Sequence, residues 1–259
     1  MSSEDNLLFA ESNGVGVITF NRAEARNALT FEMYDAIDDI CTQIHEQQLQ
    51  VSTLIITGAG EKAFAAGTDI SRFRDFKTNK HAIDYERRMD RVLGKLESLP
   101  IPTIAAIRGA CTGGGAAIAA CCDLRIASDD LRFGFPIART LGNCLSVGNL
   151  SRLVELLGAN RTREILLTSR LIQIEEALGI ALINERANDP LKRAHELAAL
   201  FKNQAPLTIS ASKEGLRRLR EHAAAVPGDD LIVQCYTSDD FHEGIDAFLT
   251  KRKPVWKGS

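Results

Sequence analysis

The first half of the chain alternates between short apolar runs and longer segments with an apolar residue at every third or fourth position. Gly16–Asn21, Thr53–Thr57 and Thr103–Ile107 are apolar runs of strand length. Thr30–Gln47 and Ala82–Ser98 carry their apolar side chains on one helical stripe. Short strands that are apolar on both faces and alternate with helices indicate parallel βαβ units.

Local signals mark where these elements begin and end. The hydroxyl of Thr30 is placed to cap the first helix, and Pro100 and Pro102 stop the second. A further strand is predicted at Leu124–Ala127, after the alanine-rich helix Ala116–Cys121. The first half of the chain therefore predicts a sheet of mainly parallel strands.

From about Gly148 onward the pattern becomes mostly helical. The predicted helices are Asn160–Thr168, Glu175–Leu178, Leu191–Asn203, Thr208–His222 and Asp239–Lys251. We therefore expect an α/β core over residues 1–200 and a helical C-terminal region over residues 201–259. A tail of this kind either docks on a neighbouring subunit or packs on its own core.

Charge and hydropathy exclude two classes of partner. The chain has 259 residues and a formal net charge of −3, which gives no basic surface for nucleic acid or for an anionic membrane. Its apolar runs, such as Ala110–Cys122, fall short of the roughly 18 residues that span a bilayer. Met1–Asn6 is polar and acidic, unlike a secretory leader. We expect a soluble, cytoplasmic protein without nucleic-acid or membrane partners.

The cysteines and histidines do not form a metal-binding pattern. None of the six cysteines belongs to a CxxC pair, and none of the five histidines belongs to an HExxH motif. Buried free thiols in a reducing compartment are the expected state of these cysteines. The sequence therefore predicts no metal site.

Two loops rich in small residues follow predicted strands, over residues 63–70 and 109–117. Ligands of parallel sheets bind at this end of the strands. Gly113, Gly114 and Gly115 precede a helix whose first N–H groups lack helical partners and can hold an anionic oxygen. Close packing of the glycines is the alternative explanation. Neither loop matches GxGxxG or the Walker motif, so no phosphate loop is expected.

Five blocks in this order resemble the crotonase (enoyl-CoA hydratase/isomerase) superfamily. They are Ile18–Thr30, Leu54–Ile70, Ile101–Ser128, Phe133–Pro136 and Glu243–Trp256. The resemblance implies a crotonase-like spiral of βαβ units with a helical C-terminal trimerisation region. It also implies homotrimers or dimers of trimers, and acyl-CoA substrates with no cofactor besides the CoA of the substrate.

The resemblance also assigns site residues. The backbone N–H groups of Thr68 and Gly114 match an oxyanion hole for the thioester carbonyl, which makes these two positions catalytic, with Arg139 as a further catalytic candidate. Lys251 matches a residue that a neighbouring subunit offers to CoA. The positions matching substrate and CoA contacts are Ala25, Arg26, Ala66, Thr68, Asp69, Ile70, Gly114 and Lys251.

Two positions depart from the hydratases of this superfamily, which carry a glutamate at each. Here they are Ala117 and Ile137, so the usual acid–base pair is absent. In the segment that follows, Arg139 can bind a substrate carboxylate, and Thr140, Asn143 or Cys144 can position water. A surface arginine and loop-capping side chains are the alternative interpretation of this segment.

A carboxyl elsewhere is a further candidate. Glu86 lies on the helix that would cover the acyl pocket, where it is either a base or part of a solvated face. The leading hypothesis is an enoyl-CoA hydratase-like enzyme that stabilises a thioester enolate. Isomerisation, decarboxylation, thioester hydrolysis and carbon–carbon lyase chemistry stay open, as does a non-catalytic acyl-CoA-binding protein.

Overall fold

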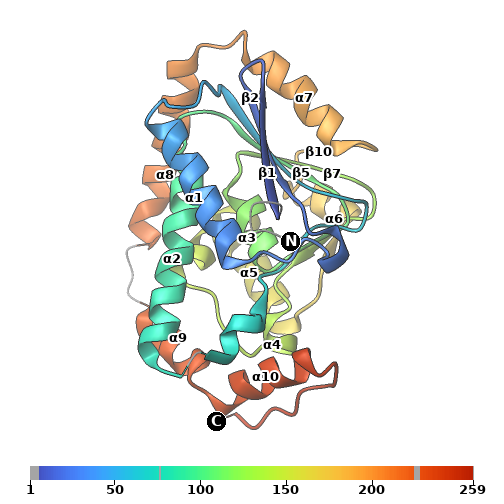
Figure 1. The fold of residues 1–259 in the computed structure, drawn as a ribbon, viewed down its shortest axis with the longest axis vertical. Helices are drawn as coiled ribbons and strands as arrows, with labels where there is room; N and C mark the ends of the chain where they lie inside the picture. Colours follow the sequence, from blue (N-terminus) through green and yellow to red (C-terminus); the bar gives the residue numbers. More distant parts are fainter. Residues whose placement is uncertain (1–5, 76, 225–227, 259) are drawn as a thin grey trace.

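The computed structural model describes residues 6–75, 77–224 and 228–258, and the acidic start of the chain at residues 1–5 lies outside them (Figure 1). A six-stranded sheet runs in the order β1 (Leu7–Ser12), β2 (Val15–Phe20), β3 (Thr53–Gly58), β5 (Thr103–Ile107), β7 (Leu124–Ala127) and β10 (Glu185–Arg186). β1 is antiparallel to β2, and every later pair is parallel. The predicted parallel sheet is confirmed.

Both faces of this sheet are buried. Ile55 of β3 and Ile104 of β5 pack with Ala194 and Ala198 of helix α7 (Pro190–Phe201). The alternate side chains of the same strands enter a larger cluster with helices on the opposite face. Burial on both faces explains why these strands are continuously apolar in sequence.

The two long helices of the first half form on that opposite face. α1 (Phe31–His45) begins where predicted, since the Thr30 hydroxyl accepts from the Met33 N–H at 3.3 Å. α2 (Asn79–Glu97) begins three residues before the predicted Ala82, because the Thr78 hydroxyl caps it by accepting from the His81 N–H at 3.3 Å. Caps of this kind satisfy N–H groups that a helix cannot pair internally.

A second sheet lies where the sequence pattern indicated only loops. Its strands are β4 (Ala63–Ala66), β6 (Ala110–Thr112), β8 (Arg132–Gly134) and β9 (Ile172–Gln173), in that order. β4 and β6 are parallel, with Ala66 opposite Thr112. Both strands end at a glycine with positive φ, Gly67 at 112° and Gly113 at 53°. The two glycine-rich segments are therefore held side by side.

The second half of the chain is helical, as predicted. Besides α7, its helices are α4 (Ile137–Thr140), α5 (Val147–Thr168), α6 (Ile174–Gly179), α8 (Pro206–Ala224), α9 (Asp229–Tyr236) and α10 (Asp239–Leu249). The short helix α3 (Gly114–Cys121) comes earlier, between β6 and β7. α5 changes direction at Gly158, whose φ is 72°. The sequence pattern indicated only the part of α5 beyond this residue, and it did not indicate α4 or α9.

The last two helices pack on the chain's own core. Phe241 of α10 and Tyr236 of α9 share a cluster with Phe73 of the 3-10 helix η3 (Ile70–Asp75). Figure 1 shows α9 and α10 at the end of the molecule away from α7. The C-terminal helices therefore close one end of the core, while the division at residue 200 and the trimerisation role stay predictions.

A membrane-spanning helix is absent from the described part of the chain, where every helix is too short or too polar.

Candidate active site

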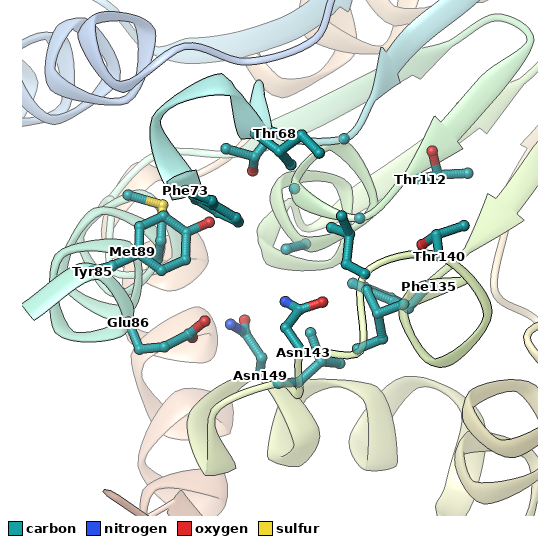
Figure 2. Close-up of a pocket in the computed structure, with 18 of the residues that line it drawn as sticks. Thr68, Phe73, Tyr85, Glu86, Met89, Thr112, Phe135, Thr140, Asn143 and Asn149 are labelled. Atoms are coloured by element: carbon teal, nitrogen blue, oxygen red, sulfur yellow. The ribbon is translucent and has the colours of Figure 1, made fainter. Parts of the chain in front are cut away.

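A cavity of about 890 Å³, part of it open to solvent, lies beyond the ends of β4 and β6. Its lining comes from η3, α2, α3, α9, α10 and the segment that contains α4. Figure 2 shows Thr68 on one side of this cavity and Glu86, Asn143 and Asn149 on another. Segments far apart in sequence therefore meet around one space.

Thr68 and Gly114 lie together at this cavity. Thr68 lies opposite Leu29 in a parallel β-bridge. The two hydrogen bonds of the bridge involve the residues on either side of Thr68: the Leu29 N–H donates to Gly67 O at 2.9 Å, and the Asp69 N–H donates to Leu29 O at 2.8 Å. The Thr68 N–H consequently faces away from Leu29. Gly114 is the first residue of α3, so its N–H has no helical partner. Within the described residues, neither N–H donates to a protein group.

The close approach of these loops requires glycine at position 114. A Cβ there would lie 2.1 Å from the Tyr34 hydroxyl and 2.8 Å from the Thr68 hydroxyl. Those two hydroxyls are themselves 2.9 Å apart and hydrogen-bonded. The packing explanation for the glycines therefore applies, and the same close packing brings the two N–H groups to one cavity, where their role toward a ligand stays a prediction.

The structure brings most of the other predicted contact residues to the same region. Ala66 N–H donates to Arg26 O at 3.0 Å, which joins the Ala25–Arg26 turn to β4. Ala66 and Ile70 line the cavity. Asp69 accepts from the Ser71 N–H at 3.1 Å and pairs with Arg22 at 3.1 Å. These contacts hold the predicted segments next to one another, and of these residues Ala66, Ile70, Thr68 and Gly114 line the cavity.

Arg139 and Lys251 lie outside the contacts described so far. The side chains of both residues are exposed, and neither lines the cavity. Arg139 lies on the short helix α4, whose Ile137 and Thr140 do face the cavity. Their proposed roles with a substrate carboxylate and with CoA stay predictions.

The two positions that the resemblance matches to hydratase glutamates are part of the cavity wall. Ala117 of α3 and Ile137 of α4 both line it. Phe135 and Met89 add to this apolar lining. The wall that would hold a carboxyl pair in a hydratase of the resembled type is therefore hydrocarbon here.

Glu86 faces this cavity from α2 and is not on a solvated helix face. Its side chain is only 7% exposed, and its carboxyl is the one carboxyl among the described lining residues. Burial raises the pKa of Glu86 to about 7, against the lowering effect of a hydrogen bond from Tyr236. The interpretation as part of a solvated helix face is therefore wrong, and the role of Glu86 as a base stays a prediction.

Thr140 at the end of α4 and the polar residues Asn143 and Cys144 after it have different surroundings. Asn143 lines the cavity and its Nδ2 donates to the Tyr236 hydroxyl at 3.1 Å. The Thr140 hydroxyl donates to Pro136 O at 2.9 Å. The Cys144 thiol donates to Leu231 O at 3.4 Å. Only Asn143 therefore joins the buried polar group around Glu86.

Sequence reasoning missed Tyr236, which contacts the Glu86 carboxyl from α9. Tyr236 is buried and lies 150 residues from Glu86 along the chain. Its only sequence signal is a Tyr at helical spacing behind Ile232, in a helix that the pattern did not reveal. As for metals, the described residues contain no group of three His, Cys, Asp or Glu that could hold an ion.

Comparison with known proteins identifies the family. Residues 10–259 match the family model described as enoyl-CoA hydratase/isomerase. A short-chain-enoyl-CoA hydratase of Clostridium acetobutylicum is 33% identical, with 96% of each chain covered. A crotonyl-CoA hydratase of Syntrophomonas wolfei is 31% identical over the same shares. This chain belongs to the enoyl-CoA hydratase/isomerase family.

Solved structures agree with this assignment. Methylmalonyl-CoA decarboxylase in complex with 2-nitronate-propionyl-CoA superposes with a TM-score of 0.85 at 26% identity, covering 98% of this chain and 99% of that one. The crotonase fold predicted from the sequence blocks is therefore confirmed. The same fold also serves a decarboxylase, so the fold leaves the reaction open.

Proposed function

We propose that this protein hydrates an enoyl-CoA thioester through an enolate, with the backbone N–H groups of Thr68 and Gly114 as the oxyanion hole. The observation that carries the proposal is the placement of these two N–H groups, without protein partners in the described chain, at an apolar cavity. The names of the hydratases that are 31–33% identical support hydration as the reaction.

The physical argument concerns the charge that develops on the thioester oxygen. When a nucleophile adds to C3 of a 2-enoyl thioester, the π electrons move toward that oxygen. Two backbone donors fixed before the reaction stabilise the enolate, and each is worth about 3–4 kcal/mol. Because the donors are main-chain groups, the substitutions at Ala117 and Ile137 leave them intact.

The remaining contacts follow from the same proposal. Ala25, Arg26, Ala66, Asp69 and Ile70 would contact the CoA arm along the rim of the cavity. Lys251 would contact CoA from a neighbouring subunit of a homotrimer or dimer of trimers. The protein would work in the cytoplasm and need no cofactor besides the CoA of its substrate.

A second reaction, the shift of a double bond between 3-enoyl and 2-enoyl thioesters, is favoured by one specific observation. Glu86 supplies the single carboxyl among the described residues that line the cavity. In the 3-enoyl to 2-enoyl direction, one carboxylate takes a proton from C2 to form a dienolate and returns it to C4, so one such group is enough, whereas the hydratases of the resembled type use two.

The test is turnover of a panel of acyl-CoA thioesters, followed by liquid chromatography and mass spectrometry. The panel contains saturated, 2-enoyl, 3-enoyl, aromatic and dicarboxylyl thioesters. Gain of one water on a 2-enoyl thioester supports hydration, and a change of retention time without a change of mass supports isomerisation. Free CoA or loss of carbon dioxide would replace the proposal by hydrolysis or decarboxylation. Binding of CoA without any turnover would favour the non-catalytic alternative.

A further inference from the structure

We propose that Glu86 is the acid–base group of this active site and that Asn143 holds the reacting water beside it. The inference deepens the proposed function and rests on it, because it needs a thioester held by the two backbone donors. It assigns the proton transfers to a helix, α2, that carries neither of the two positions occupied by glutamate in the resembled hydratases.

The position of Glu86 is the first observation. Tyr85 and Met89 of the same helix also line the cavity, so this face of α2 points inward. Next to them, a 7% exposed carboxyl stands among apolar and aromatic side chains. Burying a carboxyl costs free energy unless polar groups compensate, so a buried one in a cavity is a candidate for chemistry.

The hydrogen bonds around Glu86 are the second observation. The Tyr236 hydroxyl donates to Glu86 Oε1, and Asn143 Nδ2 donates to the Tyr236 oxygen at 3.1 Å. This chain of donors fixes the direction of the carboxyl from two distant segments. Burial outweighs the lowering effect of the Tyr236 hydrogen bond and raises the pKa of Glu86 to about 7, which suits a group that must both accept and return a proton near neutral pH.

Several ionisable groups near Glu86 affect the pKa of its carboxyl. Asp90, one turn further along α2, raises its pKa, and the backbone N–H of Ser146 lowers it. Asp90 is itself partly compensated by Arg152 of α5, at 3.8 Å. The other titratable side chains that interact with Glu86 are Tyr34, Tyr85, Cys144 and Tyr236.

An unpaired oxygen is the third observation. Asn143 Oδ1 is buried and, among the described residues, has no hydrogen-bond partner, although Asn143 lines the cavity. Figure 2 shows Asn143 and Glu86 on the same side of the cavity, with the amide nitrogen of Asn143 turned toward Glu86 and its oxygen turned away. A buried amide oxygen without a partner costs about 1–3 kcal/mol. A water that donates one hydrogen to Asn143 Oδ1 would satisfy this acceptor and leave its second hydrogen for transfer within the cavity that Glu86 also lines.

The proposed step balances with one carboxyl. The water oxygen bonds to C3 while the Glu86 carboxylate takes one of its protons and the C2–C3 π pair moves to form the enolate. The enolate then reforms the thioester carbonyl, and C2 takes the proton from the Glu86 carboxyl. One water is consumed, a 3-hydroxyacyl thioester forms, and Glu86 returns to its starting charge.

The experiment compares wild-type protein with Glu86→Gln and with Asp84→Asn, a control on the same helix whose exposed carboxyl pairs with Lys80. Two rates are measured: hydration of a 2-enoyl thioester, and exchange of the C2 hydrogens of a saturated acyl-CoA in D₂O. We expect Glu86→Gln to lower both rates at least 100-fold with little change in KM. We expect Asp84→Asn to stay within twofold of wild type.

The outcomes separate the two proposals. Hydration by wild type with an equally active, folded Glu86→Gln variant would overturn the role of Glu86 and leave the proposed function standing. C2 exchange without hydration, lost in Glu86→Gln, would support Glu86 as the base and overturn hydration. A wild-type protein that binds CoA but neither hydrates nor exchanges would overturn both.

Two further variants separate a positioning role from a merely structural one. Tyr236→Phe removes a hydrogen bond that lowers the pKa of Glu86, so the acidic limb of the kcat–pH profile should move to higher pH. An unshifted limb would contradict the assignment of that limb to Glu86.

Asn143→Ala should lower hydration at least tenfold but leave C2 exchange within threefold, because exchange needs no bound water. Equal losses of both rates would argue against the water site.

Discussion

At the scale of single residues, Gly114 illustrates how a packing requirement and a proposed catalytic one coincide. An alanine Cβ at this position would lie 2.1 Å from the Tyr34 hydroxyl, far inside van der Waals contact. We therefore expect Gly114→Ala to lower the free energy of unfolding by about 1–3 kcal/mol and to lower kcat, since the 114 N–H moves. Thermal denaturation and steady-state kinetics measure the two effects.

A matched control is available for this substitution. Gly215 lies in α8 with an exposed surface, and nothing comes within 4 Å of a Cβ built there. Gly215→Ala should stabilise the protein by about 0.5–1 kcal/mol through helix propensity, without altering kcat. Equal stability changes in the two variants would show that the contact with Tyr34 is unimportant.

Glu86 gives a prediction about stability that does not depend on substrate. Its pKa rises from 4.5 in the unfolded chain to about 7 in the folded one, so the folded state binds more protons between these values. Stability from this group is therefore highest below about pH 4.5 and falls as pH rises through 7. The difference corresponds to roughly 3 kcal/mol above pH 7.

Glu86→Gln removes this penalty, because the amide stays neutral. We expect the variant to be more stable than wild type at pH 8, by up to about 3 kcal/mol, and close to wild type at pH 5. Urea denaturation at both pH values measures the difference. Loss of stability at pH 8 would show that the Glu86 carboxylate is better solvated than its burial indicates.

At the scale of elements, α9 and α10 hold part of the proposed site in place. Phe241 of α10 is fully buried, and its ring centroid lies 4.7 Å from that of Tyr236. Phe241→Ala should lower the free energy of unfolding by about 3–5 kcal/mol and lower kcat, because Tyr236 loses its neighbour. Calorimetry and kinetics on the same preparation test both effects.

The comparison for this prediction lies on the same helix. Phe248 is 54% exposed and lines the mouth of the cavity. Phe248→Ala should change stability by less than about 1 kcal/mol and act mainly on KM. If the two phenylalanines gave equal losses of stability, α10 would not be anchored through Phe241.

At the scale of the whole molecule, α8 carries apolar side chains that the single chain leaves exposed. Leu216 is 61% exposed and Leu219 is 77% exposed, three residues apart on one side of the helix. Exposed apolar patches mark interaction surfaces. The proposed trimer or dimer of trimers accounts for them if α8 contributes to the subunit interface.

The corresponding prediction concerns mass in solution. Replacing Leu216 and Leu219 with lysine should shift the protein toward the monomer in size-exclusion chromatography with light scattering. Leu8→Lys, which changes an exposed leucine on β1, should leave the mass unchanged. A wild-type protein that is already monomeric would contradict the proposed assembly.

Much of this molecule followed from local patterns in the chain. The apolar strands, the cap at Thr30 and the paired glycine loops were predicted because each depends on residues within one or two turns of each other. Strands as short as β4 and β6 were missed, since three or four residues carry too little periodicity. α9 was missed for a related reason, as its stripe spans only eight residues.

The amino-acid sequence alone was therefore enough to predict the family, the parallel α/β core and the loops around Thr68 and Gly114. The surroundings of Glu86 were not. Its position on an amphipathic helix fits both a solvated and a buried carboxyl, and only the packing of α9 and the segment around Asn143 against α2 buries it. Burial and hydrogen bonding from Tyr236, 150 residues away, set its pKa. Such long-range contacts leave no local signal, which is why the three-dimensional fold had to decide this part of the site.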